Sequence, residues 1–462
     1  MSVLGIELND YAITGVSGDR VVFAEPGAAL LQSDGPVFGH AARAGARSMP
    51  SAYIDQYWRD LSEQTLSRPA AGIQSFADLA YAQLAQLWSH HGGGISAVLC
   101  AFPPHWGKAE LALLLGIAQE ADIPLVGLTT IPVAATRRHY PDCDLIHIEF
   151  AAGIVSLTEI LQNDGSSAQG QSESVRDLGV AALERTSAEY FARKFLECSR
   201  FDPMHDAQSE QSVYDKLPDW LALLARSPET ELQFDYKGNE FKARVSLTEL
   251  EERLRYRCQP LIQKLRARLD TGRPAALQIN AAAALFPGVV EYLADLPGCD
   301  VFVLETGAAA RGLALRSAHM KQSSGALSIT ESLPWDQSVA DVSLNRAMAS
   351  SAGSVPSHVV IGSRAYKLSN QPLRIGAESA EADYSLVVAP RHAGVSRQHC
   401  SIELRNGQAV LNDYSRFGTR LNGHKVEGST ILQAGDIVGI GDPACELKLI
   451  AEVKNAVAGE DS

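Results

Sequence analysis

A run of small and polar residues divides this 462-residue chain into two parts of different character. Residues 348–356 read Met-Ala-Ser-Ser-Ala-Gly-Ser-Val-Pro, a composition from which a packed core is hard to build. Apolar stretches alternate with helix-like stretches before this run, whereas short strand-like runs separated by Gly, Asn and Asp follow it. The sequence therefore predicts an α/β domain at 1–332, a flexible linker at 333–357, an all-β domain at 358–451 and an acidic tail at 452–462.

The first part has the alternation that is typical of α/β proteins. Val98–Phe102 predicts a buried strand, and Lys108–Ala121 predicts a helix after it. Residues 145–161 are expected to form a hairpin pair of strands. The Ser-, Gln- and Gly-rich residues 165–174 are expected to form a surface loop or a disordered connection, and residues 180–270 to be mainly helical.

Composition narrows the range of partners and locations. The chain has 40 Lys and Arg against 54 Asp and Glu, a net charge of −14 that disfavours general nucleic-acid binding. Its seven cysteines are scattered without a C-x-x-C pair, which favours reduced thiols over disulfides or a zinc site. We find no apolar stretch long enough for a membrane span and no basic, apolar start typical of a signal peptide. We therefore expect a cytoplasmic protein without a membrane partner.

The strongest motifs lie in the C-terminal part, as a series of short blocks. They read Leu373-Arg-Ile-Gly376, Gly394-Val-Ser-Arg-Gln-His-Cys-Ser-Ile402, Asn412-Asp-Tyr-Ser-Arg-Phe-Gly-Thr419, Leu421-Asn-Gly-His424 and Leu432-Gln-Ala-Gly-Asp-Ile-Val-Gly-Ile-Gly441. Asn422-Gly423 between apolar flanks predicts a tight hairpin, because both residues readily take positive φ. In the second block the hydroxyl of Ser396 can face a ligand while the imidazole of His399 tethers the backbone.

The order and spacing of these blocks resemble the forkhead-associated (FHA) domain over about residues 359–450. The resemblance implies an all-β sandwich whose loops at one end bind a phosphothreonine peptide. It implies peptide contacts for Ser396, Arg397 and Thr419, and a loop-bracing role for His399. For Ser396, a purely structural clasp of the loop is the alternative.

Two positions depart from the family pattern. The phosphate-binding Arg of the family is Ala377 here, and the Asn that holds the peptide backbone is Phe417. Loss of a charge-assisted Arg–phosphate hydrogen bond costs roughly 1.5–3 kcal/mol. Arg391, Arg416 and Arg420 are candidate replacements from neighbouring loops, and the alternative is that they are ordinary solvated surface residues.

The charge distribution also favours the sandwich as the place where an anion binds. Residues 356–451 contain ten Lys and Arg against nine Asp and Glu, a balance of +1, so the rest of the chain carries −15. An anionic ligand is therefore repelled least in this region. We expect weak binding of phosphothreonine peptides or an acidic partner. A sandwich that no longer needs phosphate and acts only as an assembly surface is the other possibility.

The first 315 residues resemble, more faintly, the actin/Hsp70 nucleotide-binding fold. The matching segments include Gly5-Ile-Glu-Leu-Asn-Asp10, Ala101-Phe-Pro-Pro104, Leu128-Thr-Thr-Ile-Pro-Val-Ala-Ala135, Ile148-Glu-Phe-Ala-Ala-Gly153 and Ile279-Asn-Ala-Ala-Ala-Ala-Leu-Phe-Pro-Gly288. The resemblance implies a duplicated, ribonuclease-H-like α/β domain. In that family two hairpin loops surround the phosphates of ATP, and glycines let backbone N–H groups approach them.

The nucleotide site implied by this resemblance is degenerate. Glu7 and Glu149 keep an acid where the family has Asp, and Gly153 is retained, but Asn9 stands where the first loop has Gly. Alanines replace family glycines at Ala151, Ala152, Ala281 and Ala282. The added Cβ atoms hinder the close approach of phosphate. We therefore expect that ATP does not bind well and that no cofactor or metal is held.

No Ser/His/Asp or Cys/His set in the sequence has the order of a known nucleophile motif. The sequence therefore favours a non-catalytic scaffold or adaptor, with an FHA module for partner peptides and a pseudo-nucleotide-binding domain. An Hsp70-like ATPase or chaperone with an FHA sensor is the alternative, and ATP binding separates the two.

Overall fold

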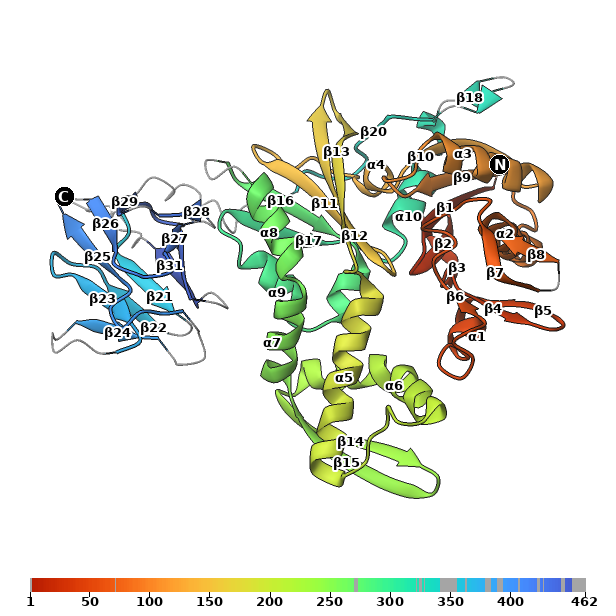
Figure 1. Ribbon diagram of the computed structural model, residues 1–462. Helices are drawn as coiled ribbons and strands as arrows, with labels where there is room; N and C mark the ends of the chain where they lie inside the picture. The colour runs from red at the N-terminus through yellow and green to blue at the C-terminus, as the bar shows by residue number, and fades with distance from the viewer. Residues whose placement is uncertain are drawn as a thin grey trace, which may run out of the picture. The chain divides into compact units, whose positions relative to one another are not determined.

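The computed structural model describes residues 2–70, 72–269, 273–320, 322–323, 326–327, 329–340, 355–361, 364–378, 384–388, 394–405, 408–421, 424–426, 428–441 and 445–450. Contacts divide the chain into two compact units (Figure 1). We call the first unit, residues 1–262, 275–294 and 301–341, the body. We call the β-domain at residues 358–450 of the second unit the sandwich.

The first sheet of the body has the strand order β10-β9-β1-β2-β3. Its strands are β1 (Val3–Asn9), β2 (Ala12–Ser17), β3 (Arg20–Glu25), β9 (Ala97–Phe102) and β10 (Leu125–Thr130). β1, β2 and β3 are antiparallel neighbours, and β9 runs parallel to both β1 and β10.

The second sheet repeats this arrangement, with the order β17-β16-β11-β12-β13 and then β20. Its strands are β11 (Asp144–Phe150), β12 (Ile154–Asn163), β13 (Ser166–Arg176), β16 (Ala275–Ile279), β17 (Cys299–Val303) and β20 (Ser332–Pro334). β11, β12 and β13 are antiparallel neighbours, and β16 is parallel to β11. The first three strands of the two sheets therefore share one topology.

Helices and smaller strand pairs complete the body, and α8 (Gln259–Arg268) continues from it into residues 263–268 of the second unit (Figure 1). The helices are α1 (Gly39–Arg43), α2 (Phe76–His91), α3 (Lys108–Glu120), α4 (Ile131–Ala135), α5 (Val180–Ser199), α6 (Ala207–Arg226), α7 (Leu247–Arg257), α8 (Gln259–Arg268), α9 (Val289–Ala294) and α10 (Ala308–Leu315), with the 3-10 turns η1 (Ala281–Leu285) and η2 (Ser317–His319). The smaller strands are β4 (Ala29–Gln32), β5 (Gly35–Phe38), β6 (Tyr53–Ile54), β7 (Thr65–Ala70), β8 (Ile73–Ser75), β14 (Glu229–Tyr236), β15 (Asn239–Ser246), β18 (Gln322–Ser323) and β19 (Ala326–Leu327).

Strand β9 illustrates why the first sheet is buried on both faces. Successive side chains of a strand point to opposite faces. Val98 and Cys100 join a core cluster with residues of α2 and α3, whereas Leu99 and Ala101 join another with residues of α4 and α10. Every residue of β9 is buried, as the continuous apolar run predicts for a strand covered by helices on both sides.

Two sequence predictions for the body are wrong in part. Residues 165–174 are predicted as a loop, but all except Gly165 belong to β13, which pairs with β12 on one side and β20 on the other. The hairpin turn is Asp164-Gly165, and both residues have positive φ. Residues 180–270 are mainly helical, but they also contain the antiparallel hairpin of β14 and β15, which turns at Lys237-Gly238.

The predicted start of the linker at residue 333 is also wrong. Leu333 is fully buried within β20, and the side chain of Trp335 donates to Ser167 Oγ at 2.7 Å. The backbone N–H of Ala340 donates to the carbonyl of His139 at 2.8 Å. The packed body therefore continues to residue 340, while 341–354 and the predicted tail at 452–462 lie outside the described residues.

The sandwich consists of two sheets over one apolar core. Their orders are β22-β21-β31-β30-β27-β28 and β24-β23-β25-β26-β29. The strands are β21 (His358–Ile361), β22 (Arg364–Lys367), β23 (Leu373–Gly376), β24 (Ser385–Val387), β25 (Cys400–Arg405), β26 (Gln408–Asp413), β27 (Arg420–Leu421), β28 (His424–Lys425), β29 (Ser429–Leu432), β30 (Ile437–Ile440) and β31 (Cys445–Ile450). Val359, Ile375, Ile402, Leu411 and Leu447 are among the side chains of this core.

The hairpin predicted at Asn422-Gly423 is consistent with the strands that flank it. β27 and β28 pair antiparallel, with Leu421 opposite His424. The two turn residues themselves lie outside the described residues.

Candidate functional site

A cavity of about 230 Å³ lies in the body where the two sheets meet. Glu7 and Asn9 line it from β1, and Glu149 lines it from β11, so the structure brings together three of the residues predicted for the degenerate nucleotide site. The described residues that line this cavity include no Lys or Arg. The cavity therefore has acidic and apolar walls without a counter-charge for a phosphate.

Glu149 has hydrogen-bond partners on both carboxylate oxygens. The side-chain amides of Asn9 and Asn280 donate to its Oε1, the latter at 3.0 Å. Its Oε2 lies 2.9 Å from Nε2 of His147, whose other ring nitrogen lies 3.2 Å from Oε1 of Gln278. Because a buried carboxylate costs free energy unless it is hydrogen-bonded, this network makes burial of Glu149 tolerable.

Glu7 accepts hydrogen bonds from the first turn of α10. Its Oε2 lies 2.9 Å from the backbone nitrogen of Ala309 and 3.4 Å from that of Ala310. Burial, followed by the nearby charge of Glu149, raises the pKa of Glu7 to about 8, although these two amides act to lower it. The N–H groups at the start of α10, a usual position for binding an anion, are therefore used by a side chain of the same protein.

The carboxyl group of Asp10, like that of Glu7, accepts a hydrogen bond from a backbone amide, and this bond joins the β1–β2 turn to the β11–β12 turn. Its Oδ1 accepts a hydrogen bond from the backbone N–H of Ala152 at 2.7 Å, and burial raises its pKa to about 6. Asp10 lies in the β1–β2 turn, and Ala152 in the β11–β12 turn. The residue after Ala152 is Gly153, the fourth residue predicted for the degenerate site.

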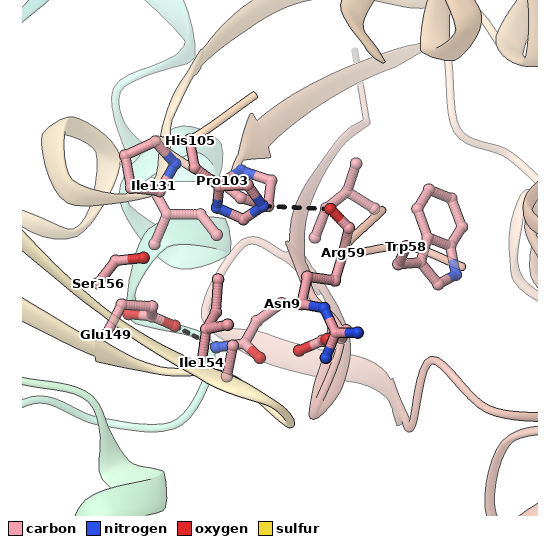
Figure 2. Close-up of a pocket in the computed structure, with 13 residues that line it drawn as sticks. Asn9, Trp58, Arg59, Pro103, His105, Ile131, Glu149, Ile154 and Ser156 are labelled. Carbon is pink, nitrogen blue, oxygen red and sulfur yellow. Dashed lines mark hydrogen bonds between the residues drawn. The ribbon is translucent and has the colours of Figure 1, made fainter. Parts of the chain in front are cut away.

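Arg59 covers Gly153. A Cβ atom built at Gly153 would lie 2.0 Å from Nη1 of Arg59, so a larger residue there would require the end of the Arg59 side chain to move. Arg59 also donates to Asp60 at 2.8 Å. Figure 2 shows Asn9 directed at Glu149, and the Arg59 side chain beside them. The pocket drawn there has a volume of about 20 Å³, which is room for about one water molecule.

These contacts limit the chemistry available in the cavity. Among the described residues, no group of three or more His, Cys, Asp and Glu side chains is placed to hold a metal ion. The turn and helix amides that could cradle a phosphate already donate to Asp10 and Glu7. An anion would have to displace carboxylates from these amides.

At one end of the sandwich, three loops that carry the FHA-like blocks converge. The backbone N–H of Ala377 donates to the carbonyl of Ser396 at 3.0 Å, and that of Arg416 donates to the Ser396 hydroxyl at 3.2 Å. Gly376 permits this approach, because a Cβ there would lie 2.0 Å from the carbonyl oxygen of Arg397. We call residues 376–378, 394–399 and 413–419 the loop end.

His399 and Asp413 stabilise the loop end from inside. Nδ1 of the buried His399 accepts a hydrogen bond from the N–H of Ser396 at 3.0 Å, and burial lowers the pKa of this imidazole. Asp413 accepts from the N–H of Ser415 at 2.9 Å and from the hydroxyl of Thr419 at 2.8 Å. Thr419 is fully buried, so its predicted peptide contact is replaced by a bracing position beneath the loop.

The exposed side chains of the loop end include two arginines and two aromatic rings, together with Ala377, Gln398 and the acid Glu378. Arg397 and Arg416 are both exposed, and the Arg416 guanidinium lies 5.7 Å from the centroid of the Phe417 ring. Ala377, at the position of the family's phosphate-binding Arg, is exposed beside them. Arg391 lies outside the described residues.

Sequence reasoning missed Asp10, Arg59, His147 and Asn280. Asp10 and Asn280 have a local signal, because each lies within a segment already matched to the nucleotide-binding fold, Asp10 as its last residue and Asn280 as its second. Arg59 has none, since it is distant in sequence from the turn that it covers. His147 is separated from Glu149 by one residue in β11, and the period of two in a strand puts both on one face.

Comparison with known proteins identifies one part of the chain. The family model of the FHA domain matches residues 373–441, which include every strand from β23 to β30. This region is therefore an FHA domain, as its motif blocks predicted. A search of curated proteins finds no match. Of the helices in the described part of the chain, none combines the length and the apolar character needed to cross a membrane.

Proposed function

We propose that this protein is a non-catalytic adaptor. Its FHA domain binds phosphothreonine-containing protein segments, and its body is an actin/Hsp70-like domain that does not use a nucleotide. FHA domains act in phosphopeptide-mediated protein interactions, and the match over residues 373–441 supports that role here. The repeated strand order of the two body sheets supports the duplicated fold.

One observation carries the proposal of an inactive nucleotide site. Backbone donors in the β11–β12 turn and at the start of α10 are bonded to carboxyl groups of the same chain: Ala152 to Asp10, and Ala309 and Ala310 to Glu7. A nucleotide would break these hydrogen bonds and bring its phosphates beside Glu149 as well. Both effects oppose binding.

Contacts across the body also favour a fixed conformation over closure around a ligand. Arg43, the last residue of α1, donates to Glu184 of α5. The N–H of Arg47 donates to Oε1 of Gln211 at 2.9 Å, and the Gln211 amide donates back to the carbonyl of Arg43 at 3.2 Å. The Arg47 guanidinium lies 3.9 Å from the centroid of the Tyr214 ring. The segment that contains α1 is thus held against α5 and α6 by the protein alone.

Calorimetric titration of the full chain with Mg-ATP tests the inactive site. We expect no affinity tighter than about 1 mM, roughly −4 kcal/mol, and no hydrolysis. Micromolar binding would instead support the alternative, an Hsp70-like ATPase with an FHA sensor.

Peptide capture tests the adaptor role. We expect the full chain to bind phosphothreonine peptides with micromolar or weaker affinity, because Ala377 supplies no charge. Binding should weaken with salt and with Ser396→Ala or Arg416→Ala. If phosphorylated and unphosphorylated peptides bind equally, the FHA domain is an assembly surface that does not read phosphate.

A further inference from the structure

We propose that Phe417 is a specificity-determining residue of the FHA domain, and that the partner carries a bulky apolar side chain within three residues of its phosphothreonine. This inference rests on the proposed phosphopeptide binding. It adds the sequence preference that the surface of this particular chain implies.

Phe417 is an exposed aromatic ring in a position that partners can reach. Its exposed fraction is 69%, compared with 61% for Tyr414 in the same loop. The hydroxyl of Tyr414 lies 3.3 Å from that of Ser401 in β25, whereas the Phe417 ring carries no polar group and has the Arg416 guanidinium 5.7 Å from its centroid. Leaving a large apolar ring in water is unfavourable, and burial against an apolar group of a partner relieves this cost.

The loop that carries Phe417 is rigidly supported, which favours its use as a contact. Asp413 accepts from Ser415 and Thr419, and the Ser415 hydroxyl accepts from the N–H of Gly418 at 2.7 Å. The Phe417 ring borders Gly394, where a Cβ would lie 3.8 Å from its Cδ2. Because these contacts hold the loop before binding, less entropy is lost when a partner covers the ring.

The neighbouring polar groups fix where the anion of the partner lies. Ser396 Oγ accepts from the N–H of Arg416, the residue directly before Phe417, and its own proton remains available for a phosphate oxygen. Arg397 and Arg416 are exposed in the loop end, whose acids are the exposed Glu378 and the part-buried Asp413. The anion site and the ring are therefore adjacent. An extended peptide advances about 3.3–3.6 Å per residue, so the apolar side chain falls one to three residues from the phosphothreonine.

The replacement of two family positions supports the same conclusion. Ala377 removes a charged contact to phosphate, and Phe417 removes a polar contact to the peptide backbone. The lost contacts are sequence-independent, whereas a ring against an apolar side chain discriminates among sequences. Contacts with a side chain of the partner therefore contribute more to binding, and contacts with its phosphate and backbone contribute less.

The test uses the full chain and two libraries of peptides with degenerate flanking positions, one with a fixed phosphothreonine and one with a fixed threonine. We expect selection of Leu, Ile, Met or an aromatic residue at one position within three residues of the phosphothreonine. Phe417→Ala should weaken binding of the selected peptide about tenfold and abolish that selection, and Phe417→Asn, which restores the family residue, should abolish the selection as well. Ile431→Ala, which truncates a 53% exposed apolar residue of β29, is the matched control and should change neither.

The outcomes separate this inference from the function on which it rests. Phosphate-dependent capture without an apolar preference, or a preference that persists in Phe417→Ala, overturns the role of Phe417 and leaves the phosphopeptide proposal intact. Equal capture from the phosphothreonine and threonine libraries overturns both.

Discussion

The cavity of the body and the loop end of the FHA domain use their polar groups in opposite ways. In the cavity, the carboxylates of Glu7 and Glu149 are buried, and each accepts hydrogen bonds from the same chain. At the loop end, buried groups brace the loops, while Arg397 and Arg416 extend into solvent. Hydrogen bonds within the chain hold the buried carboxyl groups of the cavity in the fold, whereas a braced surface with exposed charges is suited to binding.

The two regions also differ in the direction in which the fold shifts the pKa of their acidic side chains. Burial raises the pKa of Glu7 to about 8 and of Asp10 to about 6 in the body. In the FHA domain, burial alone would raise the pKa of Asp413, but hydrogen bonds from Ser415 and Thr419 lower it below its usual value. We therefore expect the stability of the two regions to depend on pH in opposite directions.

The largest loss of stability is expected in the body, where a buried arginine side chain donates hydrogen bonds to backbone carbonyl groups. The Arg316 side chain is 1% exposed and donates to the carbonyls of Gly312, Thr136, Pro334 and Ala134. Arg316→Met leaves carbonyls without a donor, each at a cost of about 1–3 kcal/mol, so we expect a loss of about 3 kcal/mol or more. Urea unfolding followed by tryptophan fluorescence measures it.

Tryptophan fluorescence reports on the body alone. All five tryptophans lie within the body: Trp58, Trp88, Trp106, Trp220 and Trp335. Arg244→Met removes an exposed arginine of β15 and is the control, with an expected change within about 0.5 kcal/mol. Equal effects of the two substitutions would show that the buried arginine does not stabilise the body.

A smaller change in stability is expected from Glu7→Gln. This substitution keeps an oxygen acceptor for the N–H of Ala309 but removes the titratable carboxyl group. The pKa of Glu7 is raised from 4.5 in the unfolded chain to about 8 in the folded one. Between these values the folded chain retains a proton that the unfolded chain loses, so the free energy of unfolding falls as pH rises. The slope is at most about 1.4 kcal/mol per pH unit. The variant should therefore be more stable than the parent chain at pH 8 and similar at pH 4.

Fluorescence-monitored unfolding at several pH values between 4 and 8 checks the effect of Glu7→Gln. Glu120→Gln, at an exposed residue of α3, should preserve the slope of the parent chain. A Glu7→Gln variant with an unchanged slope would contradict the raised pKa.

The FHA domain and the apolar strands of the body could be predicted from sequence because their signals are local. The loop blocks of the FHA domain occur in a fixed order, and β9 is a continuous apolar run. By contrast, β13 is rich in Ser, Gln and Gly, and it is a strand because its backbone pairs with β12 and β20. Backbone pairing does not depend on composition, and only the Asp164-Gly165 turn gave a local signal.

The candidate sites could be predicted only in part, for a related reason. Glu7, Asn9 and Glu149 were predicted from their motifs and do lie around one cavity. The position of Arg59 over Gly153 depends on contacts between distant segments, which no local pattern encodes. Thr419 was predicted to contact a peptide from its motif position, but its burial depends on how the loop packs on Asp413.

The smallest effect is expected in the FHA domain, from Asp413→Asn. The pKa of Asp413 is lowered, so its contribution to stability is present above the usual value near 3.8 and is lost as pH falls through the lowered value. The substitution replaces charge-assisted hydrogen bonds by weaker neutral ones. Because the side chain is partly exposed, we expect a cost of only about 0.5–1 kcal/mol at pH 7, and this cost shrinks as the pH falls below 3.8.

Hydrogen exchange of peptide fragments from β25 and β26 measures this change within the full chain, with variant and parent compared at the same pH. Asp413→Asn should speed exchange near neutral pH and approach the parent chain in acid. Glu378→Gln alters an exposed acid of the same loop end and should have no effect at either pH. A difference that grows on acidification would mean that the carboxylate of Asp413 destabilises its loop, and the contrast in pH dependence between the two regions would then be lost.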